Sequence, residues 1–152
     1  HLVLSTLHTN DSIGAITRLI DMGVEPFLLS SALIGVMAQR LVRSVCKECK
    51  TSFAAPPGAL SAYAIELPPM TRLVRGRGCS ACFDSGYKGR VAIHELLESD
   101  AALQRLIVSN PARDSLDAFV RERKLETLIH HGVQRAVAGE TTLEEVLRAV
   151  AA

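Results

Sequence analysis

Aromatic side chains and net charge are both scarce in this sequence of 152 residues. Tryptophan is absent, tyrosine occurs twice and phenylalanine four times, and the formal net charge at pH 7 is only +1. Proteins that bind nucleic acids depend on basic surfaces, and those that hold single strands also stack bases on aromatic rings. The composition therefore speaks against a nucleic-acid partner, and any other partner has to be inferred from local patterns.

Signal and membrane-spanning segments are absent as well. No basic stretch followed by an apolar one opens the sequence, and no apolar run is long enough to cross a bilayer. With 48% hydrophobic and 22% charged residues, the sequence is typical of a globular protein of one or two small domains. It does not start with methionine, and its first residues resemble the middle of a buried strand, so we expect it to be a piece of a longer protein.

Common catalytic signatures are also missing. The sequence contains no G-x-x-x-x-G-K-[ST] phosphate-binding loop and no G-x-G-x-x-G after a strand. No serine lies in a nucleophile elbow. We therefore do not expect the chain to hold a self-contained active site.

All four cysteines fall into two C-x-x-C pairs, Cys46 with Cys49 and Cys79 with Cys82. Two such turns offer four thiolates at the corners of a tetrahedron, which suits zinc at about 2.3 Å per bond. Because protein ligands would fill all four positions, the metal is expected to be structural. Two redox dithiols, a pair of disulfides and an iron–sulfur cluster are the alternatives. We favour zinc because one C-x-x-C is enough for redox chemistry and disulfides imply an oxidising compartment.

The chain before the cysteines begins with a pattern typical of α/β proteins. The run His1–Leu7 suits a buried strand, and the polar residues from His8 to Ser12 are typical of a helix start. That helix is expected to end at Gly23. His8 would then lie on a strand-to-helix turn, where open α/β sheets collect ligands and helix N–H groups face phosphates. The alternative is a histidine fixed by a local hydrogen bond.

A second helix is expected from Phe27 to Leu41, after Pro26, with apolar residues around most of its circumference. Arg40 and Arg43 would offset the dipole at its carboxyl end. The functional alternative is that one of these arginines reaches a nucleotide or a neighbouring subunit.

The segment between the cysteine pairs is rich in proline, with room for one short helix from about Ala59 to Ile65. Few of its residues could form a core, so it should depend on its metal for folding. Three arginines approach the second cysteine pair: Arg72, Arg75 and Arg77. They are expected to form a solvated face or a subunit contact, because aromatic residues that would stack bases are nearly absent, and the alternative is that they contact phosphates.

After the second cysteine pair, Arg90–Leu96 is expected to be a return strand. Four helices should follow and pack as a small bundle. They are expected at about 101–109, with a break at Asn110-Pro111; around Leu116–Val120; around Leu128–Val137; and after Thr141, with Glu144 placed for a capping box.

Several stretches resemble one known group of proteins, the secretion ATPase superfamily. His1–Asp11 (HLVLSTLHTND) closely resembles its histidine box. Asp21–Ser31 (DMGVEPFLLSS), followed by Ala38–Arg43 (AQRLVR), looks like the next segment in type II secretion ATPases. The paired C-x-x-C motifs and Gly86–Arg90 (GYKGR) resemble the family's tetracysteine zinc lobe and its exit. The resemblance covers essentially the whole chain.

The fold that this resemblance implies is α/β: the C-terminal part of a RecA-like ATPase domain with an inserted tetracysteine zinc lobe and a C-terminal helical bundle. It divides the chain into the back part of the ATPase core at 1–44, the zinc lobe at 45–89, the return strand at 90–98 and the bundle at 99–152.

The function that it implies is that of a hexameric cytoplasmic ATPase, peripheral at the inner membrane, which contacts the secretion platform proteins there. ATP hydrolysis with Mg²⁺ would drive assembly of a pseudopilus that exports folded proteins. By resemblance, His8 and His1 belong to the box near the γ-phosphate, and Arg90 would lie near the nucleotide. The implied zinc ligands are Cys46, Cys49, Cys79 and Cys82. The phosphate-binding loop and Walker B acid would lie upstream of His1, so this chain alone should be inactive.

The nearest alternative is the type IV pilus assembly ATPase, which also has a tetracysteine lobe. We favour the secretion branch because Phe27–Leu33 looks more like it. Two further alternatives belong to other functional classes of protein, a nucleic-acid-binding module and a redox protein. A zinc-ribbon module would bind nucleic acid with steep salt dependence, and a dithiol redox protein would expose a thiol of lowered pKa.

Overall fold

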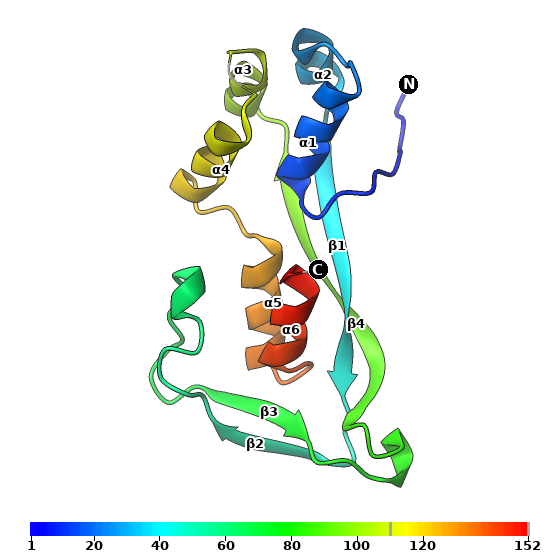
Figure 1. The fold of residues 1–152 in the computed structure, drawn as a ribbon, viewed down its shortest axis with the longest axis vertical. Coiled ribbons are helices and arrows are strands. Elements are labelled where there is room, and N and C mark those ends of the chain that lie inside the picture. Colours follow the sequence, from blue (N-terminus) through cyan, green and yellow to red (C-terminus); the bar gives the residue numbers. More distant parts are fainter. Residues whose placement is uncertain (110, 152) are drawn as a thin grey trace. The chain divides into compact units, whose positions relative to one another are not determined.

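A computed structural model describes residues 1–109 and 111–151. It is a mixed α/β structure (Figure 1). The helices are α1 (Ser12–Asp21), α2 (Pro26–Ala32), α3 (Ala101–Ser109), α4 (Arg113–Glu122), α5 (Leu128–Val137) and α6 (Leu143–Ala151). The strands are β1 (Gly35–Val45), β2 (Lys50–Ala54), β3 (Arg72–Gly76) and β4 (Tyr87–Glu98). β1 pairs with β4 in one two-stranded sheet, and β2 pairs with β3 in another.

The chain divides into two compact units. Unit 1 comprises His1–Gln39 and Glu95–Thr127, and unit 2 comprises Arg40–His94 and Leu128–Ala152. β1 and β4 each contribute residues to both units. The division at 44, 89 and 98 that the resemblance implies remains a prediction.

In unit 1, α1 begins and ends where the sequence predicts. The Asp11 side chain caps the helix by accepting a hydrogen bond from the Gly14 N–H at 2.6 Å. At the other end Gly23 adopts the left-handed conformation, with φ of +92°, and its N–H bonds back to a carbonyl of the last turn. The helix predicted from Ser12 to Gly23 is confirmed.

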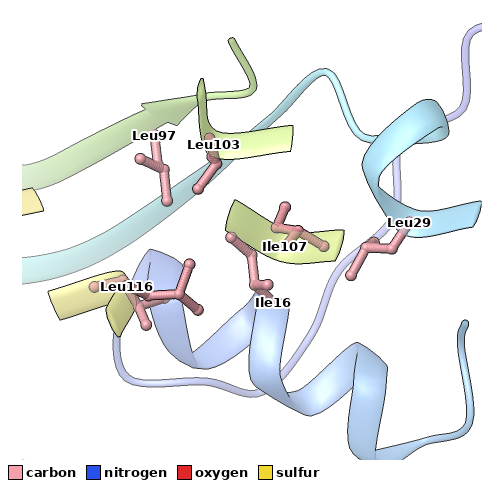
Figure 2. Close-up of a cluster of buried hydrophobic side chains, with 7 residues drawn as sticks. Ile16, Leu29, Leu97, Leu103, Ile107 and Leu116 are labelled. Atoms are coloured by element: carbon pink, nitrogen blue, oxygen red, sulfur yellow. The ribbon is translucent and has the colours of Figure 1, made fainter. Parts of the chain in front are cut away.

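The core of unit 1 is aliphatic and draws on five elements. Figure 2 shows side chains from α1, α2, β4, α3 and α4 converging on one cluster; those labelled are Ile16, Leu29, Leu97, Leu103, Ile107 and Leu116. Ile16, Leu103 and Ile107 are fully buried. Burial of this apolar area is what holds the four helices of unit 1 together.

The prediction of a strand at His1–Leu7 is wrong for this structure. Residues 1–9 have no regular secondary structure (Figure 1). The residues from His1 to His8 are exposed. A strand needs a neighbour to pair its backbone N–H and C=O groups, and no described strand pairs with this segment.

The prediction of a helix from Phe27 to Leu41 is also wrong. α2 ends at Ala32, and β1 starts three residues later. Within β1 every second residue from Val36 to Val42 is at least half-buried, which is the period of a strand. The apolar residues cover the whole helical circumference because their period is two rather than 3.6. Arg40 and Arg43 therefore lie on a strand and offset no helix dipole.

In unit 2, an antiparallel hairpin packs against the last two helices. β2 and β3 pair from Lys50 opposite Gly76 to Ala54 opposite Arg72. Leu73 of this hairpin shares a buried cluster with residues of α5 and α6. The two helices pack so closely that a Cβ on Gly132 would lie 2.3 Å from a Val146 methyl carbon.

The chain between β2 and β3 forms a loop over residues 55–71. A hydrogen bond from the Ala55 N–H to the Thr71 carbonyl, 2.9 Å long, closes it. Where the sequence predicts a short helix near 59–65, the loop makes a single 3₁₀ turn, Ser61–Tyr63. The loop and the adjoining Ala54 line a cavity of about 960 Å³.

A buried carboxylate ties α6 to β1 in unit 2. Glu145, 1% exposed, accepts hydrogen bonds from the Arg43 guanidinium at 2.5 Å and from Arg148 at 2.9 Å. These partners, the Arg43 guanidinium first, lower the pKa of Glu145 to about 2. The capping box predicted at Glu144 is not what the structure shows: the Thr142 hydroxyl caps α6 by accepting a hydrogen bond from the Glu145 N–H.

Further along the chain, most predicted elements are present. The return strand predicted at Arg90–Leu96 lies within β4, and the four predicted helices are α3 to α6. The predicted break includes Asn110, which lies outside the described residues. α3 and α4 belong to unit 1, whereas α5 and α6 belong to unit 2, so packing of all four as one bundle is not confirmed. In the described part of the chain, no helix combines the length and apolar character that spanning a membrane requires.

Candidate metal centre and histidine loop

The four cysteines lie together in unit 2 and form a compact sulfur cluster. The sulfur cluster comprises Cys46, Cys49, Cys79 and Cys82, whose Sγ atoms all lie within 4.8 Å of one another. Three of the separations are 3.9, 3.9 and 3.7 Å. Four sulfurs at about 2.3 Å from a central zinc would be about 3.8 Å apart in a tetrahedron. The cluster therefore has the dimensions of a tetrahedral metal site.

Close backbone contacts hold the two cysteine turns beside each other. The Cys46 N–H donates to the Gly86 carbonyl at 2.9 Å, and the Arg77 N–H donates to the Cys49 carbonyl at 3.1 Å. At Gly76 an added Cβ would lie only 2.0 Å from the Gly86 carbonyl oxygen. Glycine is required there because the two backbones approach too closely for any side chain.

Backbone N–H groups also favour the thiolate form of Cys82. Burial would raise the pKa of Cys82, but the N–H groups of Cys79 and Gly86 donate to its sulfur at 3.3 Å and lower that pKa to about 7. Burial raises the pKa of Cys79 to about 11, with a further rise from its contact with Cys82. A bound cation would displace the remaining protons, since metals bind the thiolate.

Two of the alternatives fit the sulfur cluster less well than a metal does. Its cysteines are free, and the sulfur separations far exceed the S–S bond of about 2.05 Å in a disulfide. A redox dithiol needs an accessible thiol, but Cys46, Cys49 and Cys82 are buried. Tetrahedral sites with four sulfur ligands hold zinc or iron. The residues present therefore fit the structural zinc that the sequence predicts.

The predicted histidines lie in unit 1. His1 is exposed in the segment without regular structure, and His8 is exposed just before α1. We call His8–Asp11 the histidine loop. Together with residues of α1 and with Arg113 of α4, this loop lines a surface cavity of about 330 Å³. The structure therefore places His8, but not His1, at a cavity that could admit a small ligand.

Residues far along the chain fix the end of the histidine loop. Glu95 of β4 accepts hydrogen bonds from the N–H and the hydroxyl of Ser12, both at 2.7 Å. Arg113 donates to both carboxylate oxygens of Asp11, at 3.0 and 2.7 Å. Sequence reasoning missed both partners. The sequence did contain a signal for Glu95: it lies two residues from both Ile93 and Leu97, so on a strand its carboxylate shares the buried face with them.

Arg90, the third predicted nucleotide residue, is exposed on β4 in unit 2. The histidines belong to unit 1. The structure thus brings together the four predicted metal ligands, whereas it gathers no such cluster around the predicted nucleotide residues within either unit.

Comparisons with known proteins complete this description. Residues 1–148 match the family model described as Type II/IV secretion system protein. The chain is 47% identical over 149 residues to the type IV pilus assembly ATPase PilB of Thermus thermophilus, covering 97% of this chain and 17% of that protein. It is 45% identical over 148 residues to the type II secretion system ATPase E of Vibrio cholerae, covering 97% of this chain and 29% of that protein.

A solved structure, that of the pilus retraction motor PilT with bound ADP, has a similar fold. The TM-score is 0.60 at 22% sequence identity, and the match covers 98% of this chain and 32% of that chain. The present chain thus spans less than a third of the length of each of these three proteins.

Proposed function

Because the chain belongs to the Type II/IV secretion system protein family, we propose that it acts within an ATPase that powers pseudopilus assembly and protein export in type II secretion. The observation that carries this proposal is the family match over residues 1–148, which includes the histidine loop and all four cysteines. In this proposal the chain is the C-terminal part of a RecA-like ATPase, with the zinc lobe as an insertion.

The sulfur cluster is proposed to hold a structural Zn²⁺. Its four buried or half-buried sulfurs and their spacing support this role. With all four positions occupied by thiolates, the metal would have no open position for water or substrate. Zinc would supply the link that keeps the two cysteine turns together, and the ATPase chemistry would take place elsewhere.

His8 is proposed to sense or polarise the γ-phosphate region of ATP bound with Mg²⁺. Its exposure and its position at a surface cavity support this role. An imidazole can donate a hydrogen bond to a phosphate oxygen, so its contact would change when the phosphate is lost. His1 and Arg90 are proposed as lesser members of the same nucleotide site.

The complete protein is proposed to be a cytoplasmic homo-hexamer, held at the inner membrane by the platform proteins of the secretion system. ATP would then be hydrolysed at subunit interfaces. This chain alone is expected to be inactive, because its sequence contains neither a phosphate-binding loop nor the strand-end acid that would hold Mg²⁺.

A second candidate is the related type IV pilus assembly ATPase. The observation in its favour is the 47% identity to PilB of Thermus thermophilus, which equals or exceeds the identities to several secretion proteins. A cell lacking one machine or the other separates the two: restoration of protein export by the complete gene supports the secretion branch, and restoration of pili alone supports the pilus branch.

The biochemical test replaces His8 in the complete protein. His8→Ala should lower kcat for ATP at least about 10-fold and change ATP affinity less than about threefold, because the contact matters most in the transition state. His130→Ala is the matched control, since His130 is an exposed histidine outside both candidate sites. Equal losses of turnover and affinity, or no loss in either, would count against the phosphate-sensing role.

A further inference from the structure

We propose that Glu95 is a positioning residue that sets where His8 stands relative to the nucleotide. This inference rests on the proposed ATPase function and deepens it. Glu95 lies on β4, far along the chain from the histidine loop, and nothing in the sequence resemblance gives it a role.

The contact between Glu95 and α1 is buried and doubly bonded. One carboxylate oxygen, Oε1, accepts both the N–H and the hydroxyl hydrogen of Ser12 at 2.7 Å. Glu95 is 8% exposed and Ser12 is 5% exposed. Hydrogen bonds to a buried carboxylate are among the stronger ones in proteins, and removing one partner leaves the other unsatisfied.

This carboxylate accepts a hydrogen bond from a backbone donor at the start of α1. A helix N-terminus has unpaired N–H groups that attract anions. In α1, however, Glu95 takes the N–H of Ser12 and Asp11 takes that of Gly14. Two of the backbone donors at the start of α1 are therefore already bonded to carboxylates. His8 lines the cavity together with Thr9, Asn10 and Asp11 of the same loop, and it is the only imidazole among the residues that line it.

Glu95 itself stays out of that cavity. The residues lining it include His8, Asp11, Gly14 and Arg113, but not Glu95. A group that does not reach the ligand space can affect catalysis only through the residues it holds. Glu95 is therefore assigned to positioning and not to catalysis.

Within unit 1, β4 is anchored beside Glu95. Leu97, two residues further along the strand, belongs to the aliphatic cluster that also contains Ile16 of α1. Only three residues separate Ser12 from His8, so a shift of the first turn of α1 would move the histidine loop with it. A displacement of about 1 Å in a catalytic group can reduce the rate up to 100-fold.

The test uses the complete ATPase with three variants. Glu95→Ala removes the acceptor and should lower kcat at least about 10-fold while the KM for ATP stays within about threefold. Glu95→Gln keeps an acceptor oxygen in place and should recover much of that loss. Glu98→Gln is the matched control, an exposed glutamate on the same strand, and should leave kcat unchanged.

A double-mutant cycle supplies a readout that general destabilisation would not produce. If Glu95 acts through Ser12, the loss of kcat in the combination of Ser12→Ala with Glu95→Ala should be well below the product of the two single losses. If Glu95→Ala does not fold, the cycle of Ser12→Ala with Glu95→Asp, whose carboxylate is one methylene shorter, decides in the same way. Independent effects, or a kcat equal to that of Glu98→Gln, would overturn the inference.

The outcome for His8→Ala separates this inference from the function on which it rests. If that variant keeps full turnover, the role of His8 itself fails. If His8→Ala loses turnover while the Glu95 variants behave like Glu98→Gln, only the positioning role of Glu95 fails.

Discussion

The interior of unit 1 is mainly aliphatic apart from the contact between Ser12 and Glu95, whereas that of unit 2 adds to its apolar residues four sulfurs and a buried carboxylate paired with Arg43. In unit 1, isoleucine and leucine side chains from five elements meet in one cluster. In unit 2, the buried apolar residues include the cluster around Leu73 as well as Val42 and Ile93, and the sulfur cluster and the contact between Glu145 and Arg43 supplement them.

The difference indicates two sources of stability in one chain. Unit 1 should behave as an ordinary folded unit that hydrophobic burial stabilises. Unit 2 should depend on its metal, since binding of a structural zinc contributes free energy directly to folding. Conditions that remove a metal should therefore affect one unit and spare the other.

The largest expected effect is that of losing the metal. Cys46→Ser, or treatment with a strong chelator, removes a contribution on the order of 10 kcal/mol and should unfold the β2–β3 hairpin. Because Leu73 packs against α5 and α6, these helices should loosen as well. Hydrogen exchange followed by mass spectrometry should show fast exchange across unit 2 and retained protection in α1 and α3.

The matched control for that experiment is Glu48→Gln, an exposed change between the two cysteines of the first pair. It should keep both the metal and the protection of the hairpin. Uniform loss of protection in both units after chelation would contradict the proposed difference between them. Metal analysis of the purified protein should give one zinc per chain.

The next effect concerns the core of unit 1. Leu103→Ala empties a fully buried site and should lower the free energy of unfolding of unit 1 by about 2–5 kcal/mol. Zinc affinity, measured by competition with a chromogenic chelator, should not change. Val108→Ala, at an exposed position of the same helix, should cost less than about 1 kcal/mol. A lowered zinc affinity in Leu103→Ala would mean that the two units do not fold independently.

The smallest of the three effects is the pH-dependent contribution of Glu145. Its pKa is about 2 in the folded chain, against an ordinary value of 4.5, so the stabilisation is fully present above pH 5. It should disappear as the pH falls towards 2, and the shift corresponds to about 3 kcal/mol. The difference in unfolding free energy between the unchanged protein and Glu145→Gln should narrow over that range. Acid also weakens the metal site, but it does so equally in both proteins, so this effect cancels in the difference. A difference in unfolding free energy that stays constant with pH would disprove the contribution of Glu145.

Features with a local cause were predictable from the sequence. The two C-x-x-C motifs predict the sulfur cluster, because each motif holds two sulfurs within one turn. The ends of α1 follow from Asp11 and Gly23, whose side chain and backbone act on their immediate neighbours.

Features with a distant cause were not predictable in this way. The segment after Ala32 has apolar residues around a whole helical circumference, which a buried helix would also have, and pairing with β4 decides in favour of the strand. The role of Glu95 depends on Ser12, far away in the sequence, so no local pattern reveals the contact. The same holds for Arg43, whose partner Glu145 lies on the last helix.

The loop over residues 55–71 gives the chain a place where its length could change. Ala54 and Arg72, at its two ends, face each other in the ladder of the hairpin, so the strands hold those ends together whatever lies between them. Doubling the length of a flexible loop costs only about 0.6 kcal/mol. A fluorescent tag or a small folded domain could therefore be inserted after Gly58 without separating β2 from β3, which would allow the assembled motor to be tracked in cells.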